Sequence, residues 1–169
     1  PDAVDAVIEN CAEGVGLYRT ECLYLNRATL PNEEEQYQTY RRVAERVLPH
    51  SLIIRTFDLG GDKLAGGVET TDEMNPFLGC RAIRYSLASR EVFRVQLRAI
   101  LRASAAGIVL ILFPMIPGRA ELRRALLIRG QGHAELRCAG EPFDGGADVG
   151  AMLGIPSPAL SAQAPSDSA

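Results

Sequence analysis

Four short apolar runs, each followed by a turn or a helical stretch, constrain the fold of this sequence more than any other feature. They cover residues 15–18, 52–54, 108–113 and 149–153, and runs of this length bounded by turn residues are typical of buried strands. Strands that are apolar throughout occur mainly in parallel sheets covered on both faces, because a crossover helix must return the chain to the same end of the sheet. The sequence therefore predicts an α/β fold.

The stretches between these runs carry helical patterns. The clearest helix follows Pro31 and Asn32, has three acidic residues in its first turn and ends at Pro49. Its apolar face is formed by Tyr37, Tyr40, Val43 and Val47. Further helices are predicted over residues 4–11, from Gly79 to Leu87, from Ser89 to Gly107 with Phe93, Leu97, Ile100 and Leu101 on the apolar side, and more weakly over 121–136, where Gly130 and Gly132 interrupt the pattern.

Strand number and spacing suggest a particular α/β architecture. Four strands at ordinary spacing amount to about half of a (β/α)₈ barrel, which typically needs roughly 250 residues. A doubly wound open sheet fits the same pattern. We predict one domain over residues 1–160. Residues 161–169 belong to a low-complexity tail, rich in Ala, Ser and Pro, which begins at Pro156 and shows no periodicity.

Charge and cysteine usage exclude several classes of function. The net charge is −3 and no long basic run is present, which argues against a nucleic-acid or membrane-surface partner. The four cysteines are scattered without a CxxC pair, so neither a zinc site nor a disulfide framework is indicated. We expect a soluble protein of a reducing cytoplasm, without a signal peptide or a membrane span. The cysteines are Cys11, Cys22, Cys80 and Cys138.

Arginines stand where an α/β fold places its functional groups. Arg19 and Arg55 follow two predicted strands directly, and Arg81 lies at the start of a predicted helix. Converging guanidinium groups suit a small substrate that carries phosphate and carboxylate, since each group donates two charge-assisted hydrogen bonds to an oxyanion. The alternative is that these arginines are surface charges or ion-pair partners of Glu21 or Asp58, and position alone does not decide between the two.

Other candidate motifs give weaker evidence of a functional site. The segment 60–63 (GGDK) lacks the order of a phosphate-binding loop, so we interpret it as an ordinary turn. His50 and His133 have no nearby nucleophile pattern, and we expect both to be solvated. The residues alone therefore assign no catalytic group and no metal ligand.

Four segments in order resemble the phosphotransferase-system enzyme I family. They are residues 14–21 (GVGLYRTE), 55–63 (RTFDLGGDK), 75–84 (NPFLGCRAIR) and 113–116 (FPMI). The resemblance is strong over residues 3–116 and continues more faintly to about Leu160. Pyruvate phosphate dikinase and phosphoenolpyruvate synthase share the same barrel, but residues 17–24 look more like enzyme I.

The resemblance implies a fold, a substrate and partners. In that family a phosphoenolpyruvate/pyruvate-type TIM barrel binds phosphoenolpyruvate and Mg²⁺. The phosphoryl group passes to a histidine on a separate domain and then to a small phosphocarrier protein. The resemblance assigns Arg19 and Arg55 to the substrate phosphate and places Arg81 in the same pocket. It implies no catalytic residue within this sequence.

Departures from the family limit the activity that we expect. Gly154 stands where the family has a magnesium-binding glutamate, and the sequence stops before the family's Asn-Asp motif, its carboxylate-binding arginine and its catalytic cysteine. We also expect no phosphohistidine domain before the barrel, and therefore little or no turnover by the chain alone. Three hypotheses follow: a fragment of a longer enzyme of this family, a non-catalytic anion-binding module, or an interaction fragment that pairs its sheet edge with a second copy. A degraded reading frame is a fourth.

Overall fold

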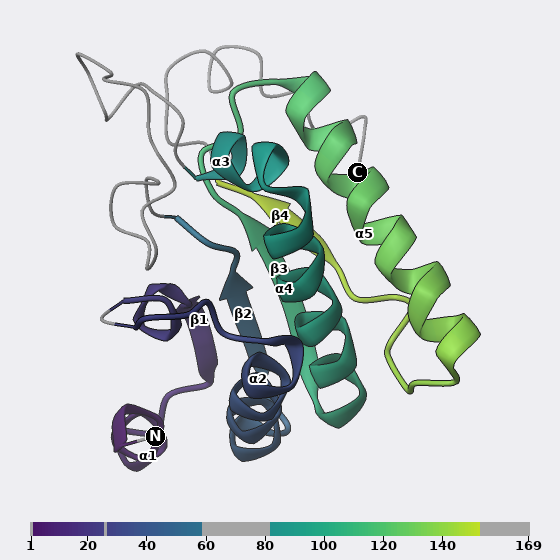
Figure 1. Ribbon diagram of the computed structural model, residues 1–169. Helices are drawn as coiled ribbons and strands as arrows, with labels where there is room; N and C mark the ends of the chain where they lie inside the picture. Colours follow the sequence, from purple (N-terminus) through teal and green to yellow (C-terminus); the bar gives the residue numbers. More distant parts are fainter. Residues whose placement is uncertain (1, 26, 59–81, 153–169) are drawn as a thin grey trace, which may run out of the picture.

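A computed structural model describes residues 2–25, 27–58 and 82–152 (Figure 1). Helices and strands alternate along most of the chain, as the sequence predicts. In order, they are α1 (Asp2–Glu9), β1 (Gly14–Arg19), the 3₁₀ turn η1 (Glu21–Leu23), α2 (Glu33–Val47), β2 (Ser51–Arg55), α3 (Ile83–Ala88), α4 (Arg90–Ala103), the 3₁₀ turn η3 (Ser104–Ala106), β3 (Ile108–Phe113), α5 (Arg119–Ala139) and β4 (Val149–Ala151).

The four strands form one parallel sheet in the order β1-β2-β3-β4. The predicted α/β class is therefore confirmed. The register between β1 and β2 shifts between Val15 and Tyr18, so that three steps along β1 match two along β2. This irregularity brings Arg19 into register with Arg55. The two arginines thus end adjacent strands at the same level.

Helices α2, α4 and α5 lie on one face of the sheet (Figure 1). Burial along the strands agrees with this arrangement: in β2 and β3 the residues Leu52, Ile54, Val109, Ile111 and Phe113 are buried, while the residues between them are at most half-buried, except Arg55 at the end of β2. Within the described residues helices therefore cover one face of the sheet, which is consistent with the predicted partial barrel, whose helices form an outer layer. An apolar run alone does not show whether helices cover one face of a strand or both faces.

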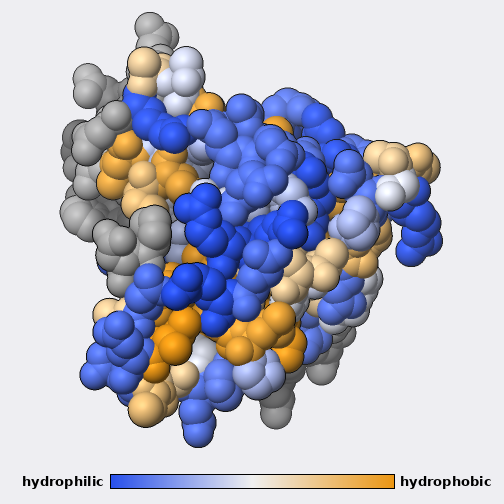
Figure 2. Space-filling model, turned by 90° about the horizontal axis from the view of Figure 1, so that it is seen from below, coloured by the Kyte–Doolittle hydropathy of each residue, from blue (hydrophilic) through white to orange (hydrophobic). Residues whose placement is uncertain are grey.

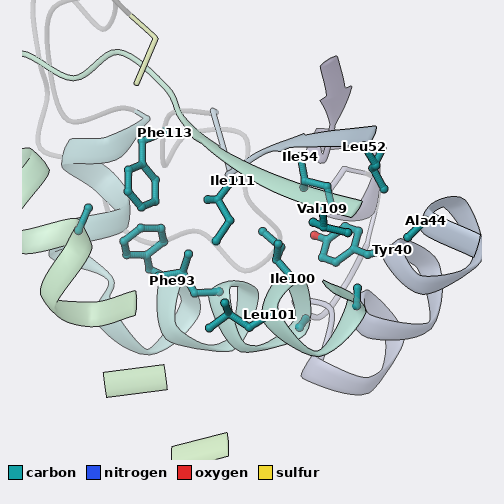
Figure 3. Packing of buried hydrophobic residues seen from close by; sticks show 14 of the residues in the cluster. Tyr40, Ala44, Leu52, Ile54, Phe93, Ile100, Leu101, Val109, Ile111 and Phe113 are labelled. Carbon is teal, nitrogen blue, oxygen red and sulfur yellow. The ribbon is translucent and has the colours of Figure 1, made fainter. Parts of the chain in front are cut away.

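The core lies between the sheet and these helices. Figure 3 shows Phe93 and Ile100 of α4 directed toward Phe113, Ile111 and Val109 of β3. The rings of Phe93 and Phe113 are 5.9 Å apart and nearly edge-to-face. Full burial of each such side chain stabilises the fold by about 1.5–3 kcal/mol, so this contact fixes α4 over β3.

Helix α2 begins where its sequence predicts. Asn32 accepts a hydrogen bond from the Glu35 amide at 2.9 Å, and the Glu35 carboxylate accepts one from the Asn32 amide at 3.0 Å. This capping box satisfies two of the backbone donors that a helix start leaves without partners. The helix then runs to Val47, just before Pro49.

Ion pairs join the three covering helices. Arg98 of α4 contacts Glu33 of α2 at 2.6 Å and Glu135 of α5 at 2.8 Å, and Arg102 contacts Glu33 at 3.0 Å. Partly exposed pairs of this kind contribute at most about 1 kcal/mol each, so they orient the helices more than they stabilise them.

Helix α5 departs from its prediction. It is continuous over 21 residues, whereas an interruption was predicted at Gly130 and Gly132. Gly132 is buried against Arg98 and Leu101 of α4, and this packing compensates for the poor helix propensity of glycine. The helix ends instead at Gly140, whose φ of +70° is the left-handed conformation that glycine adopts readily.

The remaining predictions differ in their outcome. Strand β3 has the predicted bounds, and α4 starts one residue after its predicted start. The beginning of the helix predicted from Gly79, the end of the strand predicted to reach Leu153 and the tail from Pro156 lie outside the described residues. Figure 2, a view from below onto the end where the strands begin, shows charged and apolar areas alternating. None of the described helices has the length and apolarity needed to cross a membrane.

Candidate anion-binding site

The candidate site lies at the ends of β1 and β2. Arg19 and Arg55 are the last residues of these strands and are partners in register. The side chain of Arg19 is 68% exposed and that of Arg55 only 10%. The structure therefore brings together two of the three predicted arginines. The third, Arg81, lies outside the described residues, as does the turn predicted at residues 60–63.

One carboxylate contacts both arginines. Glu21 Oε1 forms an ion pair with Arg55 Nη2, and Glu21 Oε2 lies 3.5 Å from Arg19 Nε. Arg55 Nη1 also contacts Asp58 Oδ2 at 3.0 Å. The side chains of Glu21 and Asp58 are only 7% and 9% exposed. Ion pairing with Glu21 and Asp58, which the sequence left open, therefore occurs, and it fixes the guanidinium of Arg55 in one orientation.

The Arg55 guanidinium retains an unused donor. Its Nε is buried, and no hydrogen-bond partner for it exists among the described residues. A buried donor without an acceptor costs about 1–3 kcal/mol, and a charged donor costs more. The exposed Arg19 stands beside it, so the donors that an oxyanion can reach directly at these strand ends are those of Arg19.

The charges of this cluster cancel. Two arginines face two carboxylates, so the four described side chains carry no formal net charge. A phosphate group carries close to two negative charges at neutral pH. Recognition of such a group at this edge therefore requires a further cation in addition to Arg19 and Arg55.

Behind the arginines, hydrogen bonds join the two strand ends. Thr20 Oγ1 donates to the Arg55 carbonyl at 3.0 Å. Gln96 of α4 accepts from the Phe57 amide at 3.0 Å through Oε1 and donates to Thr20 Oγ1 at 3.2 Å through Nε2. Sequence reasoning missed Gln96. The signal was its position on the apolar face of a helix, next to Leu97.

This network continues between α2 and α4. Gln36, which is fully buried, accepts from the hydroxyls of Tyr24 and Tyr40 at 2.9 and 3.1 Å. Burial raises the pKa of both phenols well above the usual range. Tyr24 and Tyr40 are therefore protonated at neutral pH and act as neutral donors.

A cavity of about 570 Å³ opens beside β1, between α1 and α2. Most of its lining is apolar, including Val4, Leu17 and Val43, and Arg19 and Arg42 also contribute. An apolar groove beside an edge strand suits chain contact better than the binding of a small anion. We therefore place the candidate site on the arginines and not in this cavity.

The two histidines differ. His50 is exposed, as predicted. His133 lies on α5, is half-buried and places its ring 5.0 Å from that of Phe143, so the expectation that it is solvated is wrong. Burial lowers its pKa, and the nearby Arg129 and Arg137 lower it further. His133 lies on a covering helix and is not part of the arginine cluster.

Metal ligands are not gathered in the described part of the chain. No group of three or more His, Cys, Asp or Glu side chains there is arranged to hold an ion. Glu21 and Asp58 point their carboxylates at Arg55. Gly154 lies outside the described residues, and so does Cys80. The thiols of Cys11, Cys22 and Cys138 are exposed and free.

Comparison with known proteins gives a consistent result. The family described as PEP-utilising enzyme, PEP-binding domain, matches residues 1–166. The phosphoenolpyruvate-protein phosphotransferase of Bacillus subtilis is 48% identical over 160 residues, which are 95% of this chain and 28% of that protein. Proteins of the same name from Listeria monocytogenes and Haemophilus influenzae are each 46% identical over 95% and 94% of this chain, again 28% of their own length. The chain thus spans little more than a quarter of these curated relatives.

Proposed function

Because this chain belongs to the PEP-binding domain family of PEP-utilising enzymes, we propose that it binds the phosphate of phosphoenolpyruvate through Arg19 and Arg55. The observation that carries the proposal is the register of β1 and β2. It sets two arginines side by side at one sheet edge, one of them buried and fixed by two carboxylates. A preorganised guanidinium donates to an oxyanion without the cost of ordering its side chain.

Arg81 completes the proposed site. The charges of Arg19, Arg55, Glu21 and Asp58 cancel, so a phosphate dianion needs another cation. Arg81 comes directly before the described segment that begins at Ala82, and the resemblance to enzyme I supports a role for it in the same pocket. We propose that Arg81 supplies the additional positive charge.

Catalysis belongs to the longer protein. We propose that residues 1–160 are one half of a (β/α)₈ barrel in a phosphoenolpyruvate-protein phosphotransferase, with residues 161–169 as a tail. In that cytoplasmic protein the phosphoryl group would pass to a histidine of another domain and then to a small phosphocarrier protein. The 28% share of the relatives' length supports this reading. We assign no catalytic residue within the chain itself.

The residues that the structure describes do not fit the Mg²⁺ that the resemblance to enzyme I implies. Glu21 and Asp58 are engaged by Arg55, and glycine at position 154 offers no carboxylate. We therefore derive no step through the metal. Phosphate binding by the chain alone is proposed to depend on its arginines.

Thermal unfolding with phosphoenolpyruvate tests the proposal. A ligand that binds only the folded state at 100 times its Kd stabilises that state by about 2.7 kcal/mol, which corresponds to a rise in Tm of roughly 5–10 °C for a chain of this size. We expect a saturable rise of this order without added Mg²⁺. Replacing both Arg19 and Arg55 with Ala is expected to abolish it.

Arg124→Ala is the matched control, because Arg124 is an exposed arginine on α5. Its removal is expected to leave the ligand-induced rise intact. Absence of any rise in the wild-type chain would contradict the proposed function. A ligand-induced rise in Tm that persists in the double variant would show that phosphoenolpyruvate binds elsewhere on the chain.

A further inference from the structure

A glutamine interrupts the apolar face of α4. Gln96 is 1% exposed and stands next to Leu97 among the residues that pack toward the sheet. A buried amide is tolerated only where its donor and its acceptor are both bonded. The partners of Gln96 therefore indicate what this side chain does.

Those partners are the segments that follow β1 and β2. Oε1 accepts from the amide of Phe57, two residues after Arg55, and Nε2 donates to Thr20 Oγ1, one residue after Arg19. Nε2 also lies 3.4 Å from the hydroxyl of Tyr40. One side chain thus bonds to a group one residue after Arg19 and to a group two residues after Arg55, without a hydrogen bond to either guanidinium.

Two further bonds close the arrangement. Thr20 Oγ1 donates to the carbonyl of Arg55 at 3.0 Å, and the Thr56 amide donates to the Leu112 carbonyl at 3.0 Å. The strand β2 ends at Arg55, so the backbone beyond it depends on these bonds for its position. Arg55 is held at its guanidinium by Glu21 and Asp58, and at its backbone by Thr20 with Gln96 behind it.

We propose that Gln96 is a positioning residue for the anion site. It holds the ends of β1 and β2 at the separation that lets Arg19 and Arg55 contact one phosphate group. This inference rests on the proposed function and deepens it. Displacement of a binding group by about 1 Å reduces its contribution strongly. Loss of the bridge is therefore expected to weaken binding although no contact with the ligand is removed.

Gln36 provides a matched control. It is as buried as Gln96 and also bonds Tyr40, and it donates to the Pro31 carbonyl at 3.2 Å. Its hydrogen bonds join α2 to the segment before it and to Tyr24, not to the strand ends. Replacing either glutamine with Met removes a buried amide of the same size, so the two variants share the general cost to stability.

The experiment compares the full chain with Gln96→Met and Gln36→Met. NMR spectra record the arginine Nε–H signals, with that of Arg55 assigned by its loss in Arg55→Lys. Titration with phosphoenolpyruvate gives the Kd. We expect Gln96→Met to shift and broaden the Arg55 signal and to raise the Kd about tenfold. Gln36→Met is expected to leave both unchanged. Thr20→Val removes the same bridge from the β1 side and replaces Gln96→Met if that variant does not fold.

Each outcome separates the positioning role from the proposed function. An unchanged Arg55 signal and Kd in Gln96→Met, or equal changes in Gln36→Met, would overturn the positioning role and leave phosphate binding standing. If the wild-type chain does not respond to phosphoenolpyruvate but only Gln96→Met alters the Arg55 signal, the proposed function fails. What then remains is that Gln96 positions the Arg55 side chain, without a role in phosphate binding.

Discussion

At the end of β2, one guanidinium contacts two nearly buried carboxylates. Removing one partner of a buried pair leaves a charge without compensation, which is more costly than losing an exposed pair. Arg55 remains in contact with Asp58 when Glu21 is absent, but it loses the partner that it shares with Arg19. The side chains at the proposed binding site are therefore also expected to contribute strongly to the stability of the fold.

Glu21→Ala is expected to lower the free energy of unfolding by about 3 kcal/mol. Urea unfolding followed by circular dichroism measures this loss. Glu45→Ala is the control, because Glu45 forms an exposed pair with Arg41 at 2.7 Å and is expected to cost less than about 0.5 kcal/mol. Equal losses in the two variants would show that burial of the Arg55 cluster is not important for stability.

The residues of the site were predictable to different degrees. Arg19 and Arg55 follow unmistakable apolar runs, so their place at the strand ends could be read from the sequence. Whether they would pair with Glu21 and Asp58 could not, because side-chain direction depends on the register shift within β1. The role of Gln96 could not be predicted from the sequence either, since its partners Phe57 and Thr20 are 39 and 76 residues away.

Among the elements, β3 and α5 show opposite limits of prediction. Six consecutive apolar residues have no competing interpretation in so short a run, and the strand has the predicted bounds. In α5 local propensity argued for a break at two glycines, but contact of Gly132 with α4 outweighs it. Tertiary packing, which a local sequence pattern does not show, therefore keeps α5 continuous.

The glycines of α5 lead to a test at this scale. Gly130 is exposed in the helix interior, and an added Cβ would meet no atom within 4 Å. Gly130→Ala is expected to stabilise the chain by about 1 kcal/mol, because alanine favours the helix. Gly140→Ala is expected to destabilise it by about 1 kcal/mol, because φ is +70° there. Thermal unfolding of both variants measures the difference, and a shift of the same sign in each would refute the account.

For the whole molecule, the most important feature is the edge of the sheet that β1 forms. Within the described residues β1 pairs only with β2, and the apolar cavity lies beside β1. Edge strands with unpaired backbone groups and adjacent apolar surface favour association with another chain. The remaining part of a longer protein would cover β1 and the cavity beside it. When that part is absent, a second copy of this chain would cover them.

We therefore expect the isolated chain to self-associate with increasing concentration, as measured by sedimentation equilibrium. Leu17, which lines the cavity and is 43% exposed, is the residue to change. Leu17→Lys is expected to shift the equilibrium toward monomer. Leu127→Lys, at a 68% exposed position on α5, is expected to have no effect. A wild-type chain that is monomeric throughout, or equal effects of the two variants, would contradict this expectation.

The strand order has a consequence for the way the molecule is made. Each of the strands β2, β3 and β4 pairs with the strand that precedes it in the sequence. A ribosome releases the chain from its N-terminus, so each strand after β1 meets a neighbour that has already been synthesised. Within the described sheet, only β1 has to wait for a later strand before it finds its first partner. The order of synthesis is also an order in which the sheet can grow.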